Sequence, residues 1–189
     1  MTTHRLNAHA LMLLFHAISV LSTFTNLPAV PQGIFNVSTR IEIHSNKIAA
    51  WEALTDFPRY PEWNPFVRAS VMVSPGNATL HDQRPKEGLR LFLRTQIPAL
   101  PSPVNNTPQT LRPTPIAWEA VTDLDLQAER WSAISDIGRG KVLYESREVF
   151  HGDMAESLKS LIGETLQACF DAQAQAFKVL LEDCNEHWV

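Results

Sequence analysis

The chain has 189 residues, 44% of them hydrophobic and 19% charged, with a formal net charge of −4. This size and composition are typical of one globular domain whose core is large enough to enclose a cavity. The net charge and the lack of a long Lys/Arg run argue against a nucleic-acid-binding protein. Its two cysteines, Cys169 and Cys184, fall in one predicted helix roughly 22 Å apart. A disulfide needs Cα atoms within about 7 Å, so they cannot pair while that helix is intact.

Residues 1–28 are predicted to be a secretory signal peptide or a membrane anchor. Residues 10–24 read ALMLLFHAISVLSTF, Arg5 precedes them, and no acidic residue occurs before Glu42. This pattern is typical of a signal peptide. The apolar stretch is short for a membrane span, which needs ~20 residues, and an uncleaved anchor is the alternative.

Three N-x-S/T triplets begin at Asn36, Asn77 and Asn105. In a secreted chain they would be glycan acceptors on surface segments, and chance occurrence is the alternative. Together with the apolar N-terminus they predict a protein of the secretory pathway, either secreted or anchored in the membrane of the endoplasmic reticulum or a vesicle.

The first half of the folded part is predicted to begin with a strand and a short helix. Residues 34–43 alternate in the manner of a strand. Ser45 is a plausible N-cap for the helix that follows, and Pro58 marks its end. Three apolar residues are expected to share one face of this helix: Ile48, Trp51 and Leu54.

Short alternating segments between turn residues predict an antiparallel meander. The strand candidates after the first are 67–73, 89–97, 116–121, 128–135 and 141–150. Within 89–97, one face carries Leu89, Leu91 and Leu93 and is expected to be core. Residues 98–115 contain six prolines, so they predict neither a helix nor a central strand but a lid beside a pocket or an unstructured insertion.

Residues 153–184 predict a long amphipathic helix with Asp153 as N-cap and a length of roughly 45 Å. Apolar residues recur there at steps of three and four: Met154, Leu158, Leu161, Ile162, Leu166, Cys169, Phe170, Phe177, Leu180 and Leu181. Such a helix needs a broad surface to pack against, and a sheet of five or six strands would supply it. The sequence therefore predicts the α+β class, with an antiparallel sheet packed on this helix.

Several short motifs resemble the polyketide cyclase/dehydrase branch of the START-like (SRPBCC) superfamily. They are the segments LTDF (54–57), YP (60–61) and WNPF (63–66), and the ending E-x-F-x-G (148–152) before a long helix with Phe177-Lys178. The resemblance implies a START-like domain over residues 34–184. It would have the helix-grip fold, a curved antiparallel sheet of about six or seven strands around the long C-terminal helix, with a cavity between sheet and helix. Members of that superfamily include cyclases and carriers of hydrophobic ligands, so the resemblance leaves the activity open.

The strand 141–150 supplies the candidate catalytic residues. Tyr144, Glu148 and Phe150 share one face at a period of two, so if Phe150 points into the core the others do too. A carboxyl group in an apolar pocket has a raised pKa, which suits Glu148 to act as acid or base, with Tyr144 assisting. The structural alternative for Glu148 is an acid that pairs with an arginine or binds the start of the long helix. The alternative for Tyr144 is a ring that packs in the core.

The substrate-binding candidates are aromatic residues and two polar ones: Trp63, Asn64, Phe66, Trp118, Phe150 and Arg94. Asn64 could orient a carbonyl or cap its own turn. Arg94 could neutralise an enolate or carboxylate, or lie solvated on its strand. The sequence contains no motif typical of a metal, nucleotide or covalent-catalysis site, so no cofactor is expected.

Two functions follow as expectations. The first is a cofactor-free cyclase that cyclises, lactonises or dehydrates a polyketide intermediate in secondary metabolism. The second is a non-catalytic protein that binds or transfers a lipid-like molecule. In either case the partner is a small hydrophobic substrate or ligand and not a nucleic acid, with membrane association possible through the N-terminus. The oligomeric state does not follow from the sequence.

Overall fold

A computed structural model describes residues 24–104 and 125–186. Its elements in chain order are β1 (Phe35–His44), α1 (Lys47–Thr55), the 3-10 helix η1 (Phe57–Arg59), α2 (Tyr60–Trp63), β2 (Val67–Val73), β3 (Arg90–Thr95), β4 (Gln127–Gly138), β5 (Lys141–His151) and α4 (Ala155–Glu186). Antiparallel strands lie against one long C-terminal helix, which confirms the predicted α+β, helix-grip class. The described residues form five strands, fewer than the six or seven expected, and the predicted strand 116–121 lies outside them.

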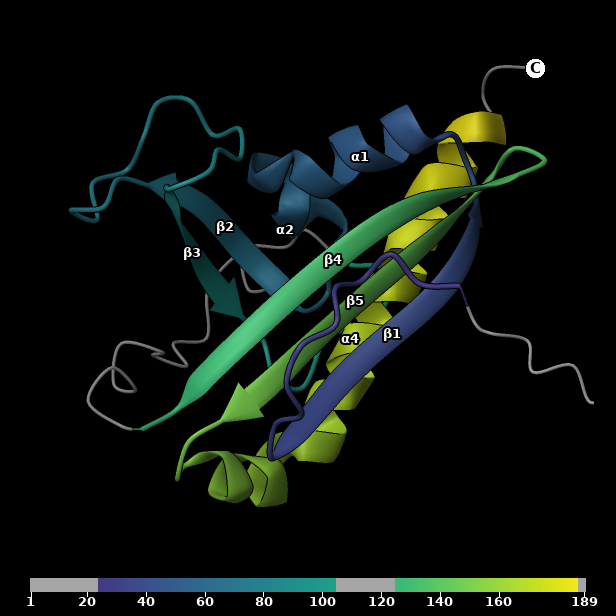
Figure 1. Cartoon of the computed structure of the whole chain (residues 1–189). Helices are drawn as coiled ribbons and strands as arrows, with labels where there is room; N and C mark the ends of the chain where they lie inside the picture. Colours follow the sequence, from purple (N-terminus) through teal and green to yellow (C-terminus); the bar gives the residue numbers. More distant parts are fainter. Residues whose placement is uncertain (1–23, 105–124, 187–189) are drawn as a thin grey trace, which may run out of the picture.

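The strands form two antiparallel sheets, one in the order β1-β5-β4 and the other pairing β2 with β3. The turn between β4 and β5 sets the register of that hairpin, so that Asp136 pairs with Val142 and Ala128 with Phe150. Figure 1 shows α4 running along one face of the larger sheet, with α1 between the C-terminal end of α4 and β2, and α2 close to β2.

The inner face of β5 and the buried face of α4 form the centre of the core. Tyr144 and Phe150 on β5 are 1% and 0% exposed, and Phe170 and Phe177 on α4 are both 0% exposed. Tyr144 and Phe150 are an even number of residues apart, so they share one face of the strand. Phe170 and Phe177 are seven residues apart, about two helical turns, so they share one face of the helix.

A chain of aromatic rings extends this core to α2. The ring of Phe177 lies 5.4 Å from that of Trp63 and 5.0 Å from that of Tyr144, and Trp63 lies 5.0 Å from Tyr60. Each such pair adds ~0.5–1.5 kcal/mol beyond its buried area. The rings therefore hold three elements from distant parts of the sequence together.

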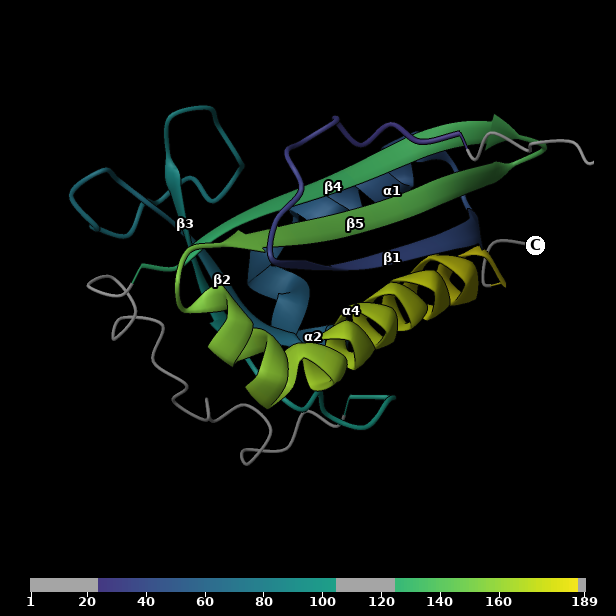
Figure 2. The same cartoon turned by 60° about the horizontal axis from the view of Figure 1, so that its bottom comes forward.

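Residues 24–33 cover the outer face of the larger sheet, opposite α4 (Figure 2). The Asn26 backbone N–H donates to Glu145 Oε2 at 3.2 Å, and its amide donates to Ser135 Oγ at 3.0 Å. Glu145 also pairs with Arg40 at 2.8 Å. Gly33 packs so closely that an added Cβ would meet Val149 Cγ1 at 2.6 Å. This segment leaves β5 buried on both faces.

Side chains of α4 satisfy the backbone groups along the open edge of β1. Gln167 bonds both the N–H and the carbonyl of Ser38, at 3.0 and 2.8 Å. Lys178 donates to the carbonyl of Glu42 at 2.8 Å. An uncovered strand edge is a template for pairing with another chain, so these contacts protect the sheet against aggregation.

Some details of the sequence interpretation are wrong. Asn46, not Ser45, caps α1, accepting from the Ala49 N–H at 2.9 Å. The buried face of α1 carries Ala50 and Leu54. Ile48 is 70% exposed because it lies about 120° around the helix from Leu54.

The long helix begins at Ala155, so its predicted cap at Asp153 lies one residue too early. Leu161 is 79% exposed and Met154 36% exposed, although both were expected in the core. At about 100° per residue, Leu161 lies about 140° around the helix from the buried Leu166. Within residues 24–104 and 125–186 no helix has both the length and the apolar content to span a membrane.

Replacing the central ring tests this packing. We expect Phe177→Ala to lower the free energy of unfolding by ~3–5 kcal/mol, because it removes a fully buried ring that contacts two others. The measurement is urea denaturation followed by circular dichroism. Leu161→Ala on the same helix is the control and should change the free energy by no more than ~0.5 kcal/mol. Equal effects of the two substitutions would contradict the assignment of the core.

Candidate functional site

A cavity of about 470 Å³ opens beside the core, bounded by α1, η1, α2, the strands β2, β3 and β4, and one side chain of α4. Its apolar wall consists of Trp51, Leu54, Phe57, Tyr60, Val67, Leu91 and Leu93. Polar residues also line it, and four of them form its base: Ser70, Arg130, Ser132 and Gln173. Apolar walls with a few convergent polar groups, at this volume, are typical of a small-molecule site.

The cavity is displaced from the place that the sequence suggested. A hollow was expected between the sheet and the long helix, but there the rings of Trp63, Tyr144 and Phe177 are in contact. The open space lies instead between the two sheets, beneath α1. The leucine face of β3, expected to be core, in fact contributes Leu91 and Leu93 to the cavity wall.

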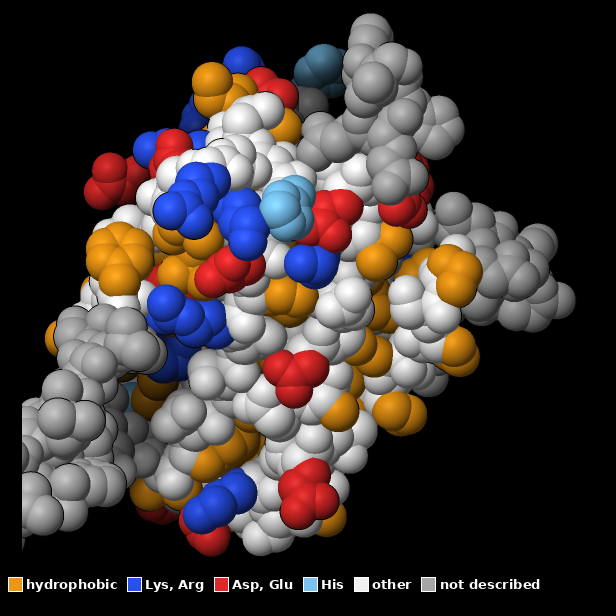
Figure 3. Space-filling view, turned by 90° about the vertical axis from the view of Figure 1, so that its right-hand side faces the viewer, with side chains coloured by type: hydrophobic (Ala, Val, Ile, Leu, Met, Phe, Trp, Pro, Cys, Tyr) orange, Lys and Arg blue, Asp and Glu red, His pale blue; other side chains and the backbone are white. Residues whose placement is uncertain are grey.

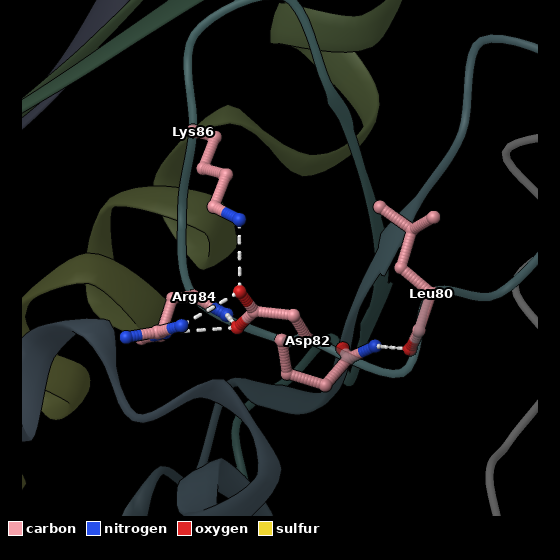
Figure 4. A network of polar contacts seen from close by, with 5 residues as sticks. Leu80, Asp82, Arg84 and Lys86 are labelled. Atoms are coloured by element: carbon pink, nitrogen blue, oxygen red, sulfur yellow. Dashed lines mark hydrogen bonds and ion pairs between the residues drawn. The ribbon is translucent and has the colours of Figure 1, made fainter.

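The rim of the cavity comes from the connection between β2 and β3, where Pro85, Lys86 and Glu87 line it. Asp82 holds this connection by accepting from Arg84 and Lys86, at 2.9 and 2.8 Å (Figure 4). These hydrogen bonds lower the pKa of Asp82.

Gln83 fastens the same connection to β2. Its Oε1 accepts from the backbone N–H of Met72 at 2.8 Å, and its amide also donates to the carbonyl of Leu80. The rim is therefore tied to the sheet that forms the wall beneath it.

The proline-rich segment 98–115 was a candidate lid. Its described part, 98–104, lies against the start of β2, where the Leu100 N–H donates to the carbonyl of Pro65 at 3.0 Å. This part contributes no residue to the cavity lining. Residues 105–115 lie outside the described residues.

Arg130 of β4 is the cation of the polar base. Its guanidinium donates to Gln173 Oε1 at 3.1 Å and lies over the Phe170 ring, 4.3 Å from the centroid. Gln173 in turn donates to the Tyr144 hydroxyl at 3.3 Å. The chain of contacts fixes the position of the charge at the base of the cavity.

Glu148 lies directly opposite Arg130 in the pairing of β4 with β5. Burial raises the pKa of the Glu148 carboxyl, and the charge of Arg130 partly opposes that rise. Glu148 and Tyr144 do not themselves line the cavity, and Tyr144 is 1% exposed behind Gln173. The predicted catalytic pair thus lies behind the residues that a ligand would touch.

Two serines complete the base. Ser70 of β2 is 4% exposed, and its hydroxyl has no hydrogen-bond partner in the described residues. Ser132 of β4 shares a hydrogen bond of 3.1 Å with Ser146. A buried hydroxyl without a partner is costly, and a cavity-lining one is available to a ligand.

The predicted substrate-binding residues lie elsewhere. Trp63, Phe66 and Phe150 are buried in the core and do not line the cavity. Asn64 caps its own turn, since its Oδ1 accepts from the N–H groups of Phe66 and Val67 at 2.9 and 2.8 Å. Arg94 is on the face of β3 away from the cavity.

Trp118 and Asn105 lie outside the described residues. Sequence reasoning also missed all four residues of the base, Ser70, Arg130, Ser132 and Gln173. The two residues on β4 had a usable signal, because the turn at Asp136–Gly140 sets Arg130 opposite Glu148 and Ser132 opposite Ser146.

A second hollow, of about 710 Å³, lies between the start of β1 and the first turns of α4. It is lined largely by residues of one helix, including Lys159, Glu164 and Gln167, and has no convergent polar base. No group of three or more His, Cys, Asp or Glu residues in the described ranges could hold a metal ion. The surface seen in Figure 3 mixes basic and acidic side chains and has no broad area of one sign.

Comparison of the sequence with protein-family models and with curated proteins finds no match. Solved structures do match. A hypothetical protein from Helicobacter pylori is 11% identical with a TM-score of 0.50, over 84% of this chain and 99% of that one. A START superfamily protein from Mycobacterium smegmatis is 20% identical with a TM-score of 0.45, over 79% of this chain and 98% of that one.

An uncharacterised protein from Bacillus thuringiensis is 13% identical with a TM-score of 0.39, over 78% of this chain and 98% of that one. At these identities the likeness concerns the fold alone. Antiparallel strands around a long C-terminal helix, with two short helices after the first strand, give this chain a helix-grip fold of the α+β class.

Proposed function

We propose that the chain binds a small hydrophobic molecule in the cavity beneath α1. The observation that carries this proposal is the cavity itself, about 470 Å³ with an apolar wall and a polar base that converges from three elements. The wall supplies burial of apolar ligand surface at ~25 cal/mol per Å². The base supplies the hydrogen bonds that fix an orientation.

A second candidate is a cofactor-free enzyme that cyclises, lactonises or dehydrates a polyketide intermediate. Glu148 favours it, because burial raises the pKa of this carboxyl and an acid with a raised pKa can donate or accept a proton near neutral pH. Glu148 stands behind Arg130 and not in the lining, so a proton would have to move past the base residues. Binding without turnover needs no such step and is the simpler proposal.

We also propose that the chain enters the secretory pathway. The support is the apolar sequence of residues 10–24 and the exposure of Asn36 and Asn77, two of the three possible glycan acceptors. Asn77 lies in the turn after β2, and Asn36 is on β1.

Filling the cavity tests the binding proposal. N-phenyl-1-naphthylamine, a neutral apolar dye, is expected to gain fluorescence with the unmodified protein. Leu91→Trp puts an indole into the cavity and should weaken this binding roughly tenfold or more. Leu91 is 39% exposed, so the change need not disturb the core.

Phe92→Trp is the matched control. Phe92 is the next residue of β3, is 46% exposed and points to the other face, so dye binding should stay unchanged. Equal loss in both variants, or none in either, would count against this cavity as the binding site.

Replacing Glu148 tests whether the chain is an enzyme or a carrier. If the chain is a cyclase, Glu148→Gln should lower product formation ~10²–10⁴-fold, since the amide cannot transfer the proton, while dye binding changes little. The measurement is metabolite profiling of cells that lack the gene and carry either the original gene or the variant. An unchanged product profile, or no accumulated linear precursor in the deletion, would eliminate the enzyme proposal.

The location has a direct test. If the protein passes through the endoplasmic reticulum, peptide-N-glycosidase should increase its gel mobility, and Asn36→Gln and Asn77→Gln should each remove part of that shift. The protein is purified from its own cells for this measurement. A chain that retains residues 1–28, as intact mass spectrometry would show, and carries no glycan would leave the secretory proposal without support.

A further inference from the structure

Arg130 has an unusual environment for a cation in the wall of an apolar cavity. It is half-buried, and among the described residues its guanidinium makes one hydrogen bond, to the neutral amide of Gln173, and no ion pair. Glu148 is its pairing partner across the two strands, and the charge of Arg130 partly opposes the rise that burial causes in the pKa of that carboxyl, but the two groups form no salt bridge. A partly desolvated guanidinium that makes no salt bridge keeps donors available for an anion.

The guanidinium is also held in place before any ligand arrives. The ring of Phe170 lies 4.3 Å below it and that of Phe66 5.7 Å away, and Gln173 fixes one of its nitrogen atoms. Because an arginine fork has five donors, several stay available for a planar, two-oxygen acceptor. Its side-chain entropy is already lost in the free protein, which favours binding.

A second observation points to the same place independently. The Ser70 hydroxyl lines the cavity from β2, is buried, and has no hydrogen-bond partner within the described residues. Arg130 and Ser70 approach the cavity from the two different sheets. A ligand with one polar group between them would satisfy both.

We propose that the bound molecule is a hydrophobic monocarboxylic acid whose carboxylate is held by Arg130 and Ser70. This inference rests on the proposed binding function and names its ligand class. A carboxylate matches the planar arginine fork, and one cation neutralises one negative charge. A phosphate dianion fits less well, since the described residues of the base supply one cation for its two negative charges.

The rest of the lining indicates which end of the ligand lies at the base of the cavity. Trp51, Leu54 and Leu91 are apolar residues of the same cavity lining. At the rim Lys86 is already paired with Asp82, and Glu87 is exposed and acidic. The carboxylate therefore lies at the base, and the apolar part of the molecule extends toward the opening.

Competition between matched ligands tests the proposal. Decanoate, 1-decanol and decyl phosphate share a chain and differ in the head group, and each is titrated against the dye N-phenyl-1-naphthylamine. We expect the unmodified protein to bind decanoate at least roughly tenfold more tightly than decanol, as a charge-assisted hydrogen bond implies. Decyl phosphate should bind more weakly than decanoate.

Arg130→Gln should abolish the preference for decanoate and leave decanol binding within about twofold, since the amide keeps much of the side-chain volume. Lys86→Gln removes a cation from the rim of the same cavity and should keep the preference. Ser70→Ala should weaken decanoate binding several-fold, and it provides a second test should Arg130→Gln fail to bind the dye. Equal binding of decanoate and decanol to the unmodified protein, tighter binding of decyl phosphate, or a preference that survives both Arg130→Gln and Ser70→Ala would overturn the inference.

The two proposals fail in different ways. If the dye and decanol bind but decanoate has no advantage, the ligand class is wrong and the binding function stands. If neither the dye nor any of the three ligands binds the unmodified protein, the proposed function itself fails.

Discussion

The contact of Phe177 with Trp63 and Tyr144 decides where this protein can have a binding site. The three rings come from α4, α2 and β5, and they fill the space between the long helix and the larger sheet. A protein interior is packed as densely as an organic crystal, so rings in contact leave no room for a ligand there. The same rings seat α2 and set the start of β2 beside it. The remaining space therefore lies between the two sheets, under α1, and its size follows from the packing of the core.

Arg130 links this core to the site. Its guanidinium is supported from below by Phe170, a core ring of α4, and through Gln173 it is connected to the Tyr144 hydroxyl. The charge at the base of the cavity is thus fixed by the residues that hold the fold together. The same charge acts on Glu148, where it opposes the rise in pKa that burial causes. One cation cannot fully neutralise both a buried acid and a ligand carboxylate. In a carrier Arg130 would bind the ligand, whereas in a proton-transfer enzyme it would act mainly on Glu148.

The sequence predicted the elements well and the site less well, for identifiable reasons. The period of β5 and the steps of three and four along α4 are strong local signals, and they placed Tyr144, Phe150, Phe170 and Phe177 correctly in the core. The prediction that Leu161 is buried was wrong, because steps of three and four residues can be counted to an apolar residue that lies on the exposed side of the helix. The cavity could not be predicted, because whether aromatic rings leave a gap depends on contacts between distant segments. The position of Arg130 could have been predicted from the register of the β4–β5 hairpin. The unpartnered hydroxyl of Ser70 depends on the pairing of β2 with β3, which the sequence does not reveal.

The base and the rim of the cavity differ in how they are built, and this difference has a functional consequence. The base consists of residues of β2, β4 and α4 that are tied to the core, so its chemistry is fixed whenever the protein is folded. The rim consists of residues 85–87, held by short-range contacts of Asp82 and Gln83 that involve no core side chain of α4 or β5. Changes at the rim can therefore alter access and chain length of a ligand without unfolding the protein. Changes at the base alter which head group is accepted, so selectivity for the head and for the tail of a ligand resides in separate parts of the structure.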